Sequence, residues 1–249
     1  MLSVENISVK RARSHKSTRE QFLALDDVSF TLPAAKTLAV VGESGAGKST
    51  LIAAILNLLK PFSGAITWCA EPMSIGTASL VMQEPRAAFN PALSIRQSVM
   101  EPIVASGKSL PDGQLKYLCE KLELPLDLLT RRPHEISIGQ AQRAGILRAL
   151  INVPPLVLFD EPLSALDAIT QKHSARLIAN LQAEHGFAAL IVTHDLGYAV
   201  AFSDEIVVLR AGRIEEITKA KDFLQAPRSE YGNTLRDAAV ALGALESSA

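Results

Sequence analysis

The chain has 249 residues, of which 48% are hydrophobic, and its 25 basic and 26 acidic residues leave a net charge of -1. This length and apolar content are enough for a substantial core, as one large domain or two lobes, and the balanced charge excludes the basic field that nucleic-acid partners need. We expect no transmembrane segment, no secretory signal at the N-terminus, and reduced thiols at Cys69 and Cys119, which lack metal-ligand spacing.

The first 33 residues predict two strands joined by a polar loop. Residues 2–9 alternate apolar and polar side chains, as a half-buried strand does. Residues 10–20 are polar and basic, which indicates a solvated hairpin loop or, alternatively, a contact with a polyanion. Residues 22–32 resume strand character until Pro33 stops it.

A glycine-rich stretch at residues 42–50 fits G-x-x-x-x-G-K-[ST], the nucleotide-phosphate loop. Residues 37–41 before it are a continuous apolar run typical of a buried parallel strand, and residues 50–59 after it are apolar enough for a buried helix that ends at Lys60-Pro61. Strand, loop and helix follow in the order that phosphate binding requires. The residues expected to contact a nucleotide here are Gly42, Glu43, Ser44, Gly45, Ala46, Gly47, Lys48, Ser49 and Thr50.

The chemistry of this loop depends on its glycines and its lysine. Gly42, Gly45 and Gly47 allow tight turns and close approach of the backbone to phosphates. Successive N–H groups and the helix N-terminus then present partial positive charge to the anion. We expect Lys48 to reach the β- and γ-phosphates and the Ser49 hydroxyl to hold Mg²⁺.

The middle of the chain predicts two short strands and then a mostly helical lobe. Residues 65–68 and 79–82 are the strands, joined by a loop around residues 72–76. Helical spacing recurs at residues 94–104, 115–122 and 140–151. Four prolines are expected to break these helical segments: Pro102, Pro111, Pro125 and Pro133.

The last hundred residues return to alternating strands and helices. Continuous apolar strands are predicted at residues 156–159 and 188–192, on either side of a helix at 169–184. A hairpin follows at 205–210 and 213–217, and then a tail helix at 234–245. The chain therefore divides into a first core part (1–85), a helical lobe (86–152), a second core part (153–218) and a tail (219–249). The predicted fold class is α/β: a P-loop (RecA-like) core with a mainly parallel sheet, an N-terminal antiparallel β part and an inserted α-helical lobe.

Polar residues at the ends of the buried strands are candidates for hydrolysis of a bound nucleoside triphosphate. Asp160 ends one strand and can hold a Mg²⁺ shell, while Glu161 after it is a candidate general base, although a capping pair would also fit. His194 ends another strand and could donate to the γ-phosphate and help orient the water, or serve the structure only. Gln83 ends a third and could contact Mg²⁺ or water. The expected metal residues are therefore Ser49, Gln83 and Asp160, and the expected catalytic residues are Glu161, His194 and Gln83.

In their order and spacing these residues resemble the nucleotide-binding subunit of an ATP-binding cassette (ABC) transporter over nearly the whole chain. The family signature Leu-Ser-Gly-Gly-Gln reads Ile136-Ser137-Ile138-Gly139-Gln140 here. The resemblance implies ATP and Mg²⁺ as cofactors and a head-to-tail dimer that sandwiches two ATP molecules. It assigns further nucleotide contacts to Ser137, Gly139, Gln140 and Asp167.

Within the family the chain looks most like the ATPases of oligopeptide, dipeptide and nickel importers. The similarity lies in residues 83–91, in residues 161–171 and in the tail segment 229–232. It implies an ATP-hydrolysing subunit at the cytoplasmic face of the inner (cell) membrane, bound peripherally. Its partners would be a second ATPase subunit, identical or homologous, two integral membrane permeases and, indirectly, a substrate-binding protein. A soluble ABC ATPase of a metabolic complex such as carbon–phosphorus lyase is the alternative.

Two positions depart from the family pattern. Ile138 stands where the family has a glycine, at a position where the backbone approaches a nucleotide. A β-branched residue adds bulk and excludes positive φ. We therefore expect the ATP site that this signature completes to be weakened or tuned. The aromatic residue that usually stacks on adenine is missing near residues 9–11. Phe22 or Arg11 are the candidates for that contact.

Overall fold

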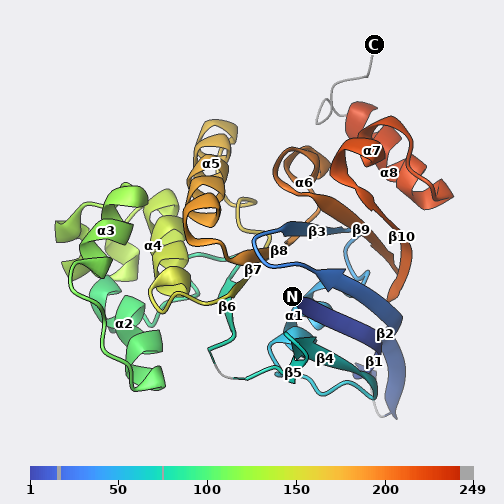
Figure 1. The fold of residues 1–249 in the computed structure, drawn as a ribbon, viewed down its shortest axis with the longest axis horizontal. Helices are drawn as coiled ribbons and strands as arrows, with labels where there is room; N and C mark the ends of the chain where they lie inside the picture. The colour runs from blue at the N-terminus through green and yellow to red at the C-terminus, as the bar shows by residue number, and fades with distance from the viewer. Residues whose placement is uncertain (16–17, 75, 242–249) are drawn as a thin grey trace. The chain divides into compact units, whose positions relative to one another are not determined.

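The computed structural model describes residues 1–15, 18–74 and 76–241, which form two compact units. The first unit contains residues 1–73 and 190–249, and the second contains residues 74–189. Figure 1 gives the element labels used below. The four-part division expected from the sequence stays a prediction.

An antiparallel sheet opens the first unit, in the strand order β2-β1-β4-β5. Its long strands β1 (Leu2–His15) and β2 (Thr18–Leu32) pair along their length, and β4 (Ser63–Trp68) and the two-residue β5 (Glu71–Pro72) follow on the other side of β1. The apolar residues that alternate along β1 are buried, as the sequence predicted. The N-terminal antiparallel part is therefore confirmed.

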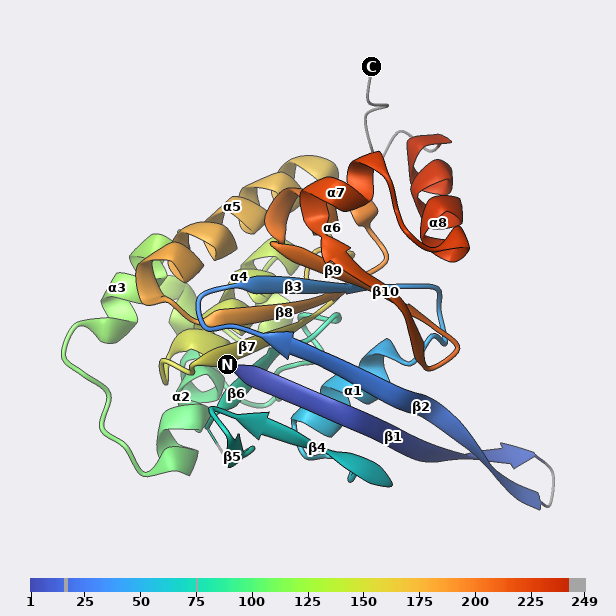
Figure 2. The same ribbon diagram turned by 45° about the vertical axis from the view of Figure 1, so that its right-hand side comes forward.

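The predicted loop at residues 10–20 is wrong, because β1 continues to His15 and β2 begins at Thr18 (Figure 2). Lys10 pairs with Leu23 across the ladder, and its ammonium lies 3.5 Å from the ring centroid of Phe62. Residues 10–12 and 21–23 are exposed. Such a ribbon needs no apolar alternation, because its backbone hydrogen bonds form whatever the side chains. Polar composition alone therefore could not separate this ribbon from a loop.

The other strands of the first unit lie in the order β10-β9-β3-β8. The buried β3 (Thr37–Val41) runs parallel to β9 (Glu205–Arg210), and β10 (Arg213–Lys219) returns antiparallel to β9 as the predicted hairpin. Residues 190–193 of β8 (Ala188–Thr193) belong to this unit.

The described part of the first unit contains four helices. Helix α1 (Lys48–Ile55) starts inside the phosphate loop and ends earlier than expected, because residues 56–59 form a turn in which Asn57 has a φ of 57°. Helices α6 (Leu196–Phe202) and α7 (Ala220–Gln225) were not predicted, and α8 (Glu230–Ala241) begins before residue 234. The predicted end of the tail helix at 245 lies outside the described residues.

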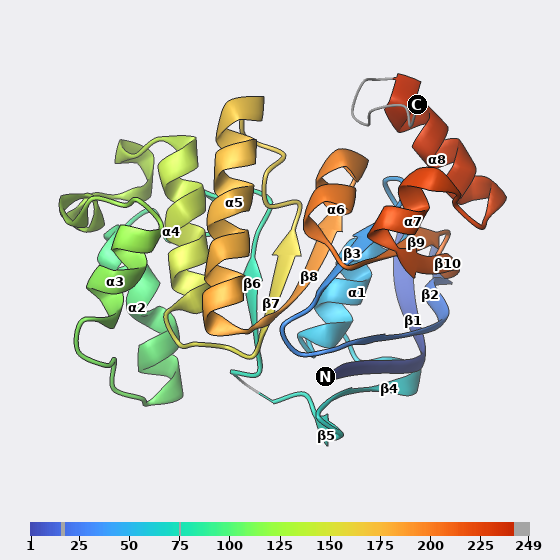
Figure 3. The same ribbon diagram turned by 45° about the horizontal axis from the view of Figure 1, so that its top comes forward.

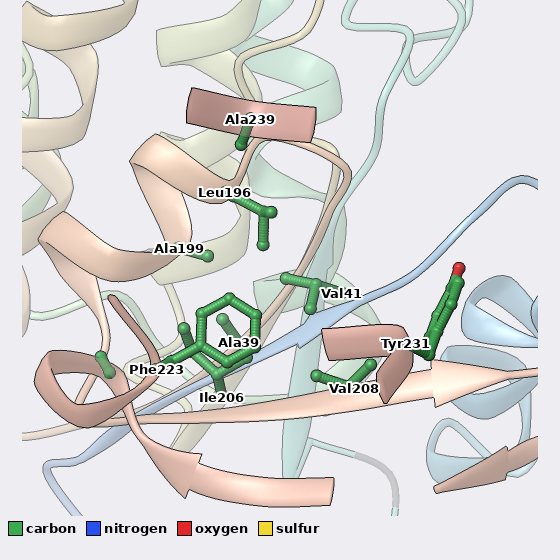
Figure 4. Close-up of a cluster of buried hydrophobic side chains, with 10 residues drawn as sticks. Ala39, Val41, Leu196, Ala199, Ile206, Val208, Phe223, Tyr231 and Ala239 are labelled. Carbon is green, nitrogen blue, oxygen red and sulfur yellow. The ribbon is translucent and has the colours of Figure 1, made fainter. Parts of the chain in front are cut away.

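A buried apolar cluster joins the last three of these helices to the strands. It draws residues from β3, α6, β9, α7 and α8, and Phe223 at its centre is fully buried (Figure 4). Because α6, α7 and α8 are short, this shared cluster contributes more to their stability than helix propensity does.

The second unit combines a parallel strand pair with a group of helices. Strand β6 (Ala78–Val81) pairs in parallel with β7 (Leu156–Asp160). The helices are α2 (Ile95–Ser106), α3 (Gln114–Lys121), α4 (Ile138–Leu150) and α5 (Ala168–His185), with 3₁₀ helices η1 (Leu126–Thr130) and η2 (Pro133–Glu135) (Figure 3).

One predicted helix break is wrong: Pro102 lies inside α2, which continues to Ser106 and ends at Gly107 in the left-handed conformation. The proline removes one backbone hydrogen bond, but the buried residues Ile95, Val99 and Ile103 hold the helix on its apolar face. The predicted α/β class, with parallel strand pairs, an antiparallel N-terminal part and a helical lobe, is confirmed. Among the residues that the structure describes, no helix is both long enough and apolar enough to span a bilayer.

Candidate functional site

The phosphate-loop sequence lies between β3 and α1, and two of its glycines are required by close packing. Gly42 has a φ of +154°, and a Cβ there would lie 2.1 Å from the backbone oxygen of Leu209. Gly47 has a φ of +112°, and a Cβ there would lie 2.6 Å from the backbone oxygen of Ala24. Both positions exclude every residue with a side chain. The loop can therefore turn sharply from the strand into the helix.

Lys48 is the first residue of α1, and its side chain folds back over the loop. The residue is only 7% exposed, and Nζ donates hydrogen bonds to the carbonyl oxygens of Gly42 (2.7 Å) and Glu43 (3.0 Å). Carbonyl oxygens are weaker partners for an ammonium than phosphate oxygens, because they carry only partial negative charge. The geometry thus holds a cation beside the N-terminus of a helix, which is the arrangement that binds phosphates.

The remaining loop residues divide by exposure. Glu43, Ser44, Gly45 and Ser49 face solvent, whereas Ala46 and Thr50 are buried. The Ala46 carbonyl accepts a hydrogen bond from the Gly212 backbone N–H at 2.8 Å. The exposed residues of the loop remain accessible to a ligand, while the buried ones attach the loop to the first unit.

His194 also lies in the first unit, directly after β8. Its side chain is exposed, and the next residue, Asp195, caps α6 by accepting a hydrogen bond from the Tyr198 backbone N–H at 2.9 Å. His194 therefore lies in the short turn between the end of β8 and the start of α6, and the Asp195 cap fixes the far side of that turn.

In the second unit, Gln83 and Glu161 meet. The Gln83 side-chain amide donates to Oε2 of Glu161 at 2.8 Å. Glu161 has a φ of 45°, in the left-handed region that residues with side chains rarely adopt. Such strain tends to accumulate at functional sites, where the surrounding structure holds a side chain in one orientation. The expected base is therefore in contact with Gln83, the residue expected to contact Mg²⁺ or water.

Asp160 is partly buried at the end of β7, one residue before Glu161. The described residues contain no cluster of three or more His, Cys, Asp or Glu that could hold a metal alone. Mg²⁺ prefers oxygen ligands. Ser49 offers a hydroxyl in the first unit, and Gln83 and Asp160 offer an amide and a carboxylate in the second unit.

The signature residues form the N-terminus of α4. Ser137 is the N-cap: its hydroxyl accepts from the Gln140 N–H at 3.1 Å, and the Gln140 side-chain oxygen accepts from the Ser137 N–H at 2.9 Å. Ile138 is helical, so the sequence argument about positive φ does not apply to it, and only its bulk, 44% exposed, remains. Gly139 is not required by the fold, because a Cβ there would make an ordinary 3.5 Å contact with Thr170.

Asp167 is also a helix cap. Its carboxylate accepts from the Thr170 hydroxyl at 2.7 Å and from the Thr170 N–H at 3.0 Å, and these hydrogen bonds lower its pKa. A capping carboxylate of low pKa stays charged at neutral pH, so a fixed negative group lies at the start of α5.

Two arginines that sequence reasoning did not single out support the signature. Arg86 donates to the Ile136 carbonyl, directly before the N-cap, and Arg148 donates to the Ala88 carbonyl while its guanidinium lies 4.8 Å from the ring centroid of Phe89. Burial lowers the pKa of Arg148. Arg86 lies in residues 83–91, where the sequence resembles importer ATPases, but that resemblance did not predict which backbone carbonyl the side chain reaches.

The two candidates for stacking on adenine occupy neighbouring positions. Arg11 and Phe22 are register partners across β1 and β2, and Phe22 is 41% exposed. The structure thus brings both candidates to one place on the ribbon. Of the expected site residues, the first unit carries 42–50 and His194, and the second carries Gln83, Ser137, Gly139, Gln140, Asp160, Glu161 and Asp167.

Comparison with known proteins supplies independent findings. The family model described as ABC transporter matches residues 25–164. The oligopeptide transport ATP-binding protein OppF of Haemophilus influenzae is 34% identical over 94% of this chain and 75% of its own length, and OppF of Streptococcus mutans is 33% identical over 96% and 81%. Among solved structures, the dimeric post-hydrolysis state of the ATP-binding cassette MJ0796 bound to ADP and Pi superposes with a TM-score of 0.76, at 27% identity over 88% of this chain and 99% of that one.

Replacing Gly42 by alanine should destabilise the chain, because the new Cβ meets a backbone carbonyl that cannot move without disturbing β9. We expect the free energy of unfolding to fall by more than about 1 kcal/mol. The matched control is Gly139→Ala, which has room for a Cβ in a helix and should leave stability unchanged or raise it by up to about 1 kcal/mol. Urea unfolding of both variants checks this, and equal losses would contradict the packing argument.

Proposed function

Because the chain belongs to the ABC transporter family and is an ATPase, we propose that it powers a peptide importer, as the ATP-hydrolysing subunit of a membrane complex. The similarity to OppF proteins over more than nine-tenths of the chain supports peptides as the transported class. The contact between Gln83 and the strained Glu161 is the observation that carries the hydrolytic part of the proposal.

Residues 42–50 would bind the phosphates of ATP. The loop amides and the N-terminus of α1 would bind phosphate oxygens, and Lys48 would exchange its two carbonyl partners for the β- and γ-phosphates. This exchange replaces partial charges with full ones, so the lysine gains electrostatic energy when ATP binds. Arg11 or Phe22 would stack on the adenine ring.

Glu161 would accept a proton from the water that attacks the γ-phosphate. Its hydrogen bond from Gln83 orients the carboxylate, which can accept the proton of a water molecule in its charged form. Gln83 would also orient that water, and His194 would donate to the γ-phosphate. Ser49, Gln83 and Asp160 would hold Mg²⁺, which when bound neutralises charge on the β- and γ-phosphates.

The signature would act on ATP bound by an opposite subunit in a head-to-tail dimer. Ser137, Gly139 and Gln140 at the N-terminus of α4 offer a hydroxyl, backbone amides and the positive end of the helix dipole to a γ-phosphate. Packing within the chain leaves room for a side chain at Gly139, so a glycine there would serve the close approach of the nucleotide. Asp167 would contact the same interface. ATP then favours the closed dimer, because it would touch both subunits there and only one when the dimer is open.

Two integral membrane permeases and, through them, a substrate-binding protein would complete the complex at the cytoplasmic face of the inner membrane. The region around residues 83–101 would dock on a permease helix. Nickel is a second candidate for the transported solute, and its only support is the resemblance to peptide and nickel importers. A soluble ATPase of a complex such as carbon–phosphorus lyase is the competing function, with the same ATP chemistry and different partners.

Replacing Glu161 by glutamine should slow ATP hydrolysis about 10²-fold or more while ATP binding persists, because the isosteric amide cannot accept the proton of the attacking water. Steady-state phosphate release and nucleotide binding measure the two effects. Glu123→Gln is the matched control: this exposed glutamate pairs with His173 at 2.8 Å in the same unit and should leave the rate unchanged. A near-normal rate in Glu161→Gln would refute its role.

Restoring glycine at position 138 should raise ATP turnover of the assembled complex if the bulk of Ile138 hinders an approaching nucleotide. If the second ATPase is a different protein, the increase in turnover should appear at the ATP bound by the partner's phosphate loop and not at the ATP bound near Lys48. Turnover of the purified complex with and without the Ile138→Gly substitution is the measurement. An unchanged rate would show that the bulk has no effect.

Purification from detergent-solubilised membranes with the full chain as bait separates the two candidate functions. An importer subunit should recover two hydrophobic permeases and a second ATPase. Recovery of soluble metabolic enzymes without permeases would replace the importer with the complex-bound ATPase and leave the proposed ATP chemistry intact.

A further inference from the structure

The tail helix reaches the phosphate loop through one side chain. The hydroxyl of Tyr231, in the first turn of α8, accepts a hydrogen bond from the backbone N–H of Glu43 at 3.3 Å. The two residues are 188 positions apart in the chain, and Tyr231 is 6% exposed. Burial raises the pKa of Tyr231, so its hydroxyl keeps its proton at neutral pH.

Several independent contacts hold Tyr231 in this place. Oε2 of the buried Glu216 accepts hydrogen bonds from the backbone N–H groups of Arg228 and Ser229, each at 2.5 Å. The Ser229 hydroxyl in turn accepts from the Gly232 N–H at 2.8 Å, and a Cβ at Gly232 would lie 2.5 Å from Glu216. Residues 228 and 229, just before Tyr231, are therefore hydrogen-bonded to β10, and Gly232, just after it, packs closely against Glu216.

The tyrosine ring is held as firmly as its backbone. It belongs to the buried cluster that includes Val41 and Val208 (Figure 4), and the guanidinium of Arg210 lies 4.5 Å from its centroid. Val41 is the residue directly before the phosphate loop. The same cluster thus carries both the strand that leads into the loop and the side chain that touches the loop.

Glu43 is consequently held at both of its backbone polar groups. Its N–H donates to Tyr231, and its carbonyl accepts from Lys48 Nζ at 3.0 Å. We infer that Tyr231 is a positioning residue for nucleotide binding, which acts through the Glu43 backbone and couples helix α8 to the state of the phosphate loop. This inference rests on the proposed role of residues 42–50 in binding ATP.

The coupling has a physical consequence in each direction. Tyr231 limits the conformations of the loop before ATP arrives, so less conformational entropy is lost on binding. When Lys48 leaves the Glu43 carbonyl for a phosphate, that carbonyl still accepts from the Ala46 N–H at 3.1 Å within the loop, and the bond to Tyr231 still ties the Glu43 N–H to the start of α8. Affinity for ATP should therefore depend on a hydroxyl that need not touch the nucleotide.

Tyr231→Phe in the full chain tests the inference, because it removes the hydroxyl and keeps the ring. We expect the Kd for a non-hydrolysed ATP analogue to rise about 2- to 10-fold, the usual scale for one neutral hydrogen bond, and KM to rise while kcat stays within about twofold. Amide hydrogen exchange in residues 42–47 should also become faster. Tyr198→Phe is the matched control, since this equally buried tyrosine, 7% exposed, packs on Phe202 in α6.

Each outcome decides a specific point. Unchanged affinity and exchange in Tyr231→Phe, or equal effects in Tyr198→Phe, would overturn the positioning role. In the unmodified chain, the ATP analogue should slow exchange in residues 228–241 as well as in 42–50, and no change in 228–241 would overturn the coupling even if Tyr231→Phe failed to fold. Lys48→Ala tests the proposed function separately: normal ATP binding in that variant would refute the phosphate loop itself.

Discussion

The close approach of Gly42 to the Leu209 carbonyl is the constraint on which the first unit's candidate site depends. A Cβ at Gly42 would lie 2.1 Å from that oxygen, so the loop can begin there only because glycine leaves the space empty. The approach itself follows from the parallel pairing of β3 with β9, in which Val41 lies opposite Val208. The strand register therefore requires glycine at position 42 and fixes where the loop begins. The start of the loop in turn places Lys48 and the N-terminus of α1.

An analogous register places the reactive groups of the second unit. Val81 pairs with Phe159 in parallel strands, so Gln83 and Glu161, each two residues further along, emerge at the same edge and form a hydrogen bond. Parallel strands carry their carboxyl ends to one side of a sheet, where ligands of α/β proteins bind. The left-handed backbone at Glu161 then turns the chain sharply after the strand and aims the carboxylate at Gln83.

The sequence predicted elements best where local pattern and burial agree. The strands predicted at 37–41, 156–159 and 188–192 are continuous apolar runs that the structure buries almost completely, in β3, β7 and β8. The sequence-based prediction failed where local pattern and burial disagree. Residues 10–15 form a strand although their side chains are mostly polar, and α6 and α7 are too short to show a helical period. Pro102 indicated a break that the packing of α2 overrode.

The sequence by itself determined the chemistry of the candidate site, because the glycine pattern, the lysine and the strand-end carboxylates act through neighbours in the chain. Their roles as donors, acceptors or bases belong to the residue types and to the elements that precede them. Only the tertiary structure decided the contacts between distant segments: Gly42 with Leu209, Arg86 with the carbonyl before Ser137, and Tyr231 with Glu43. Such contacts depend on strand register and on how helices pack, which no local pattern specifies.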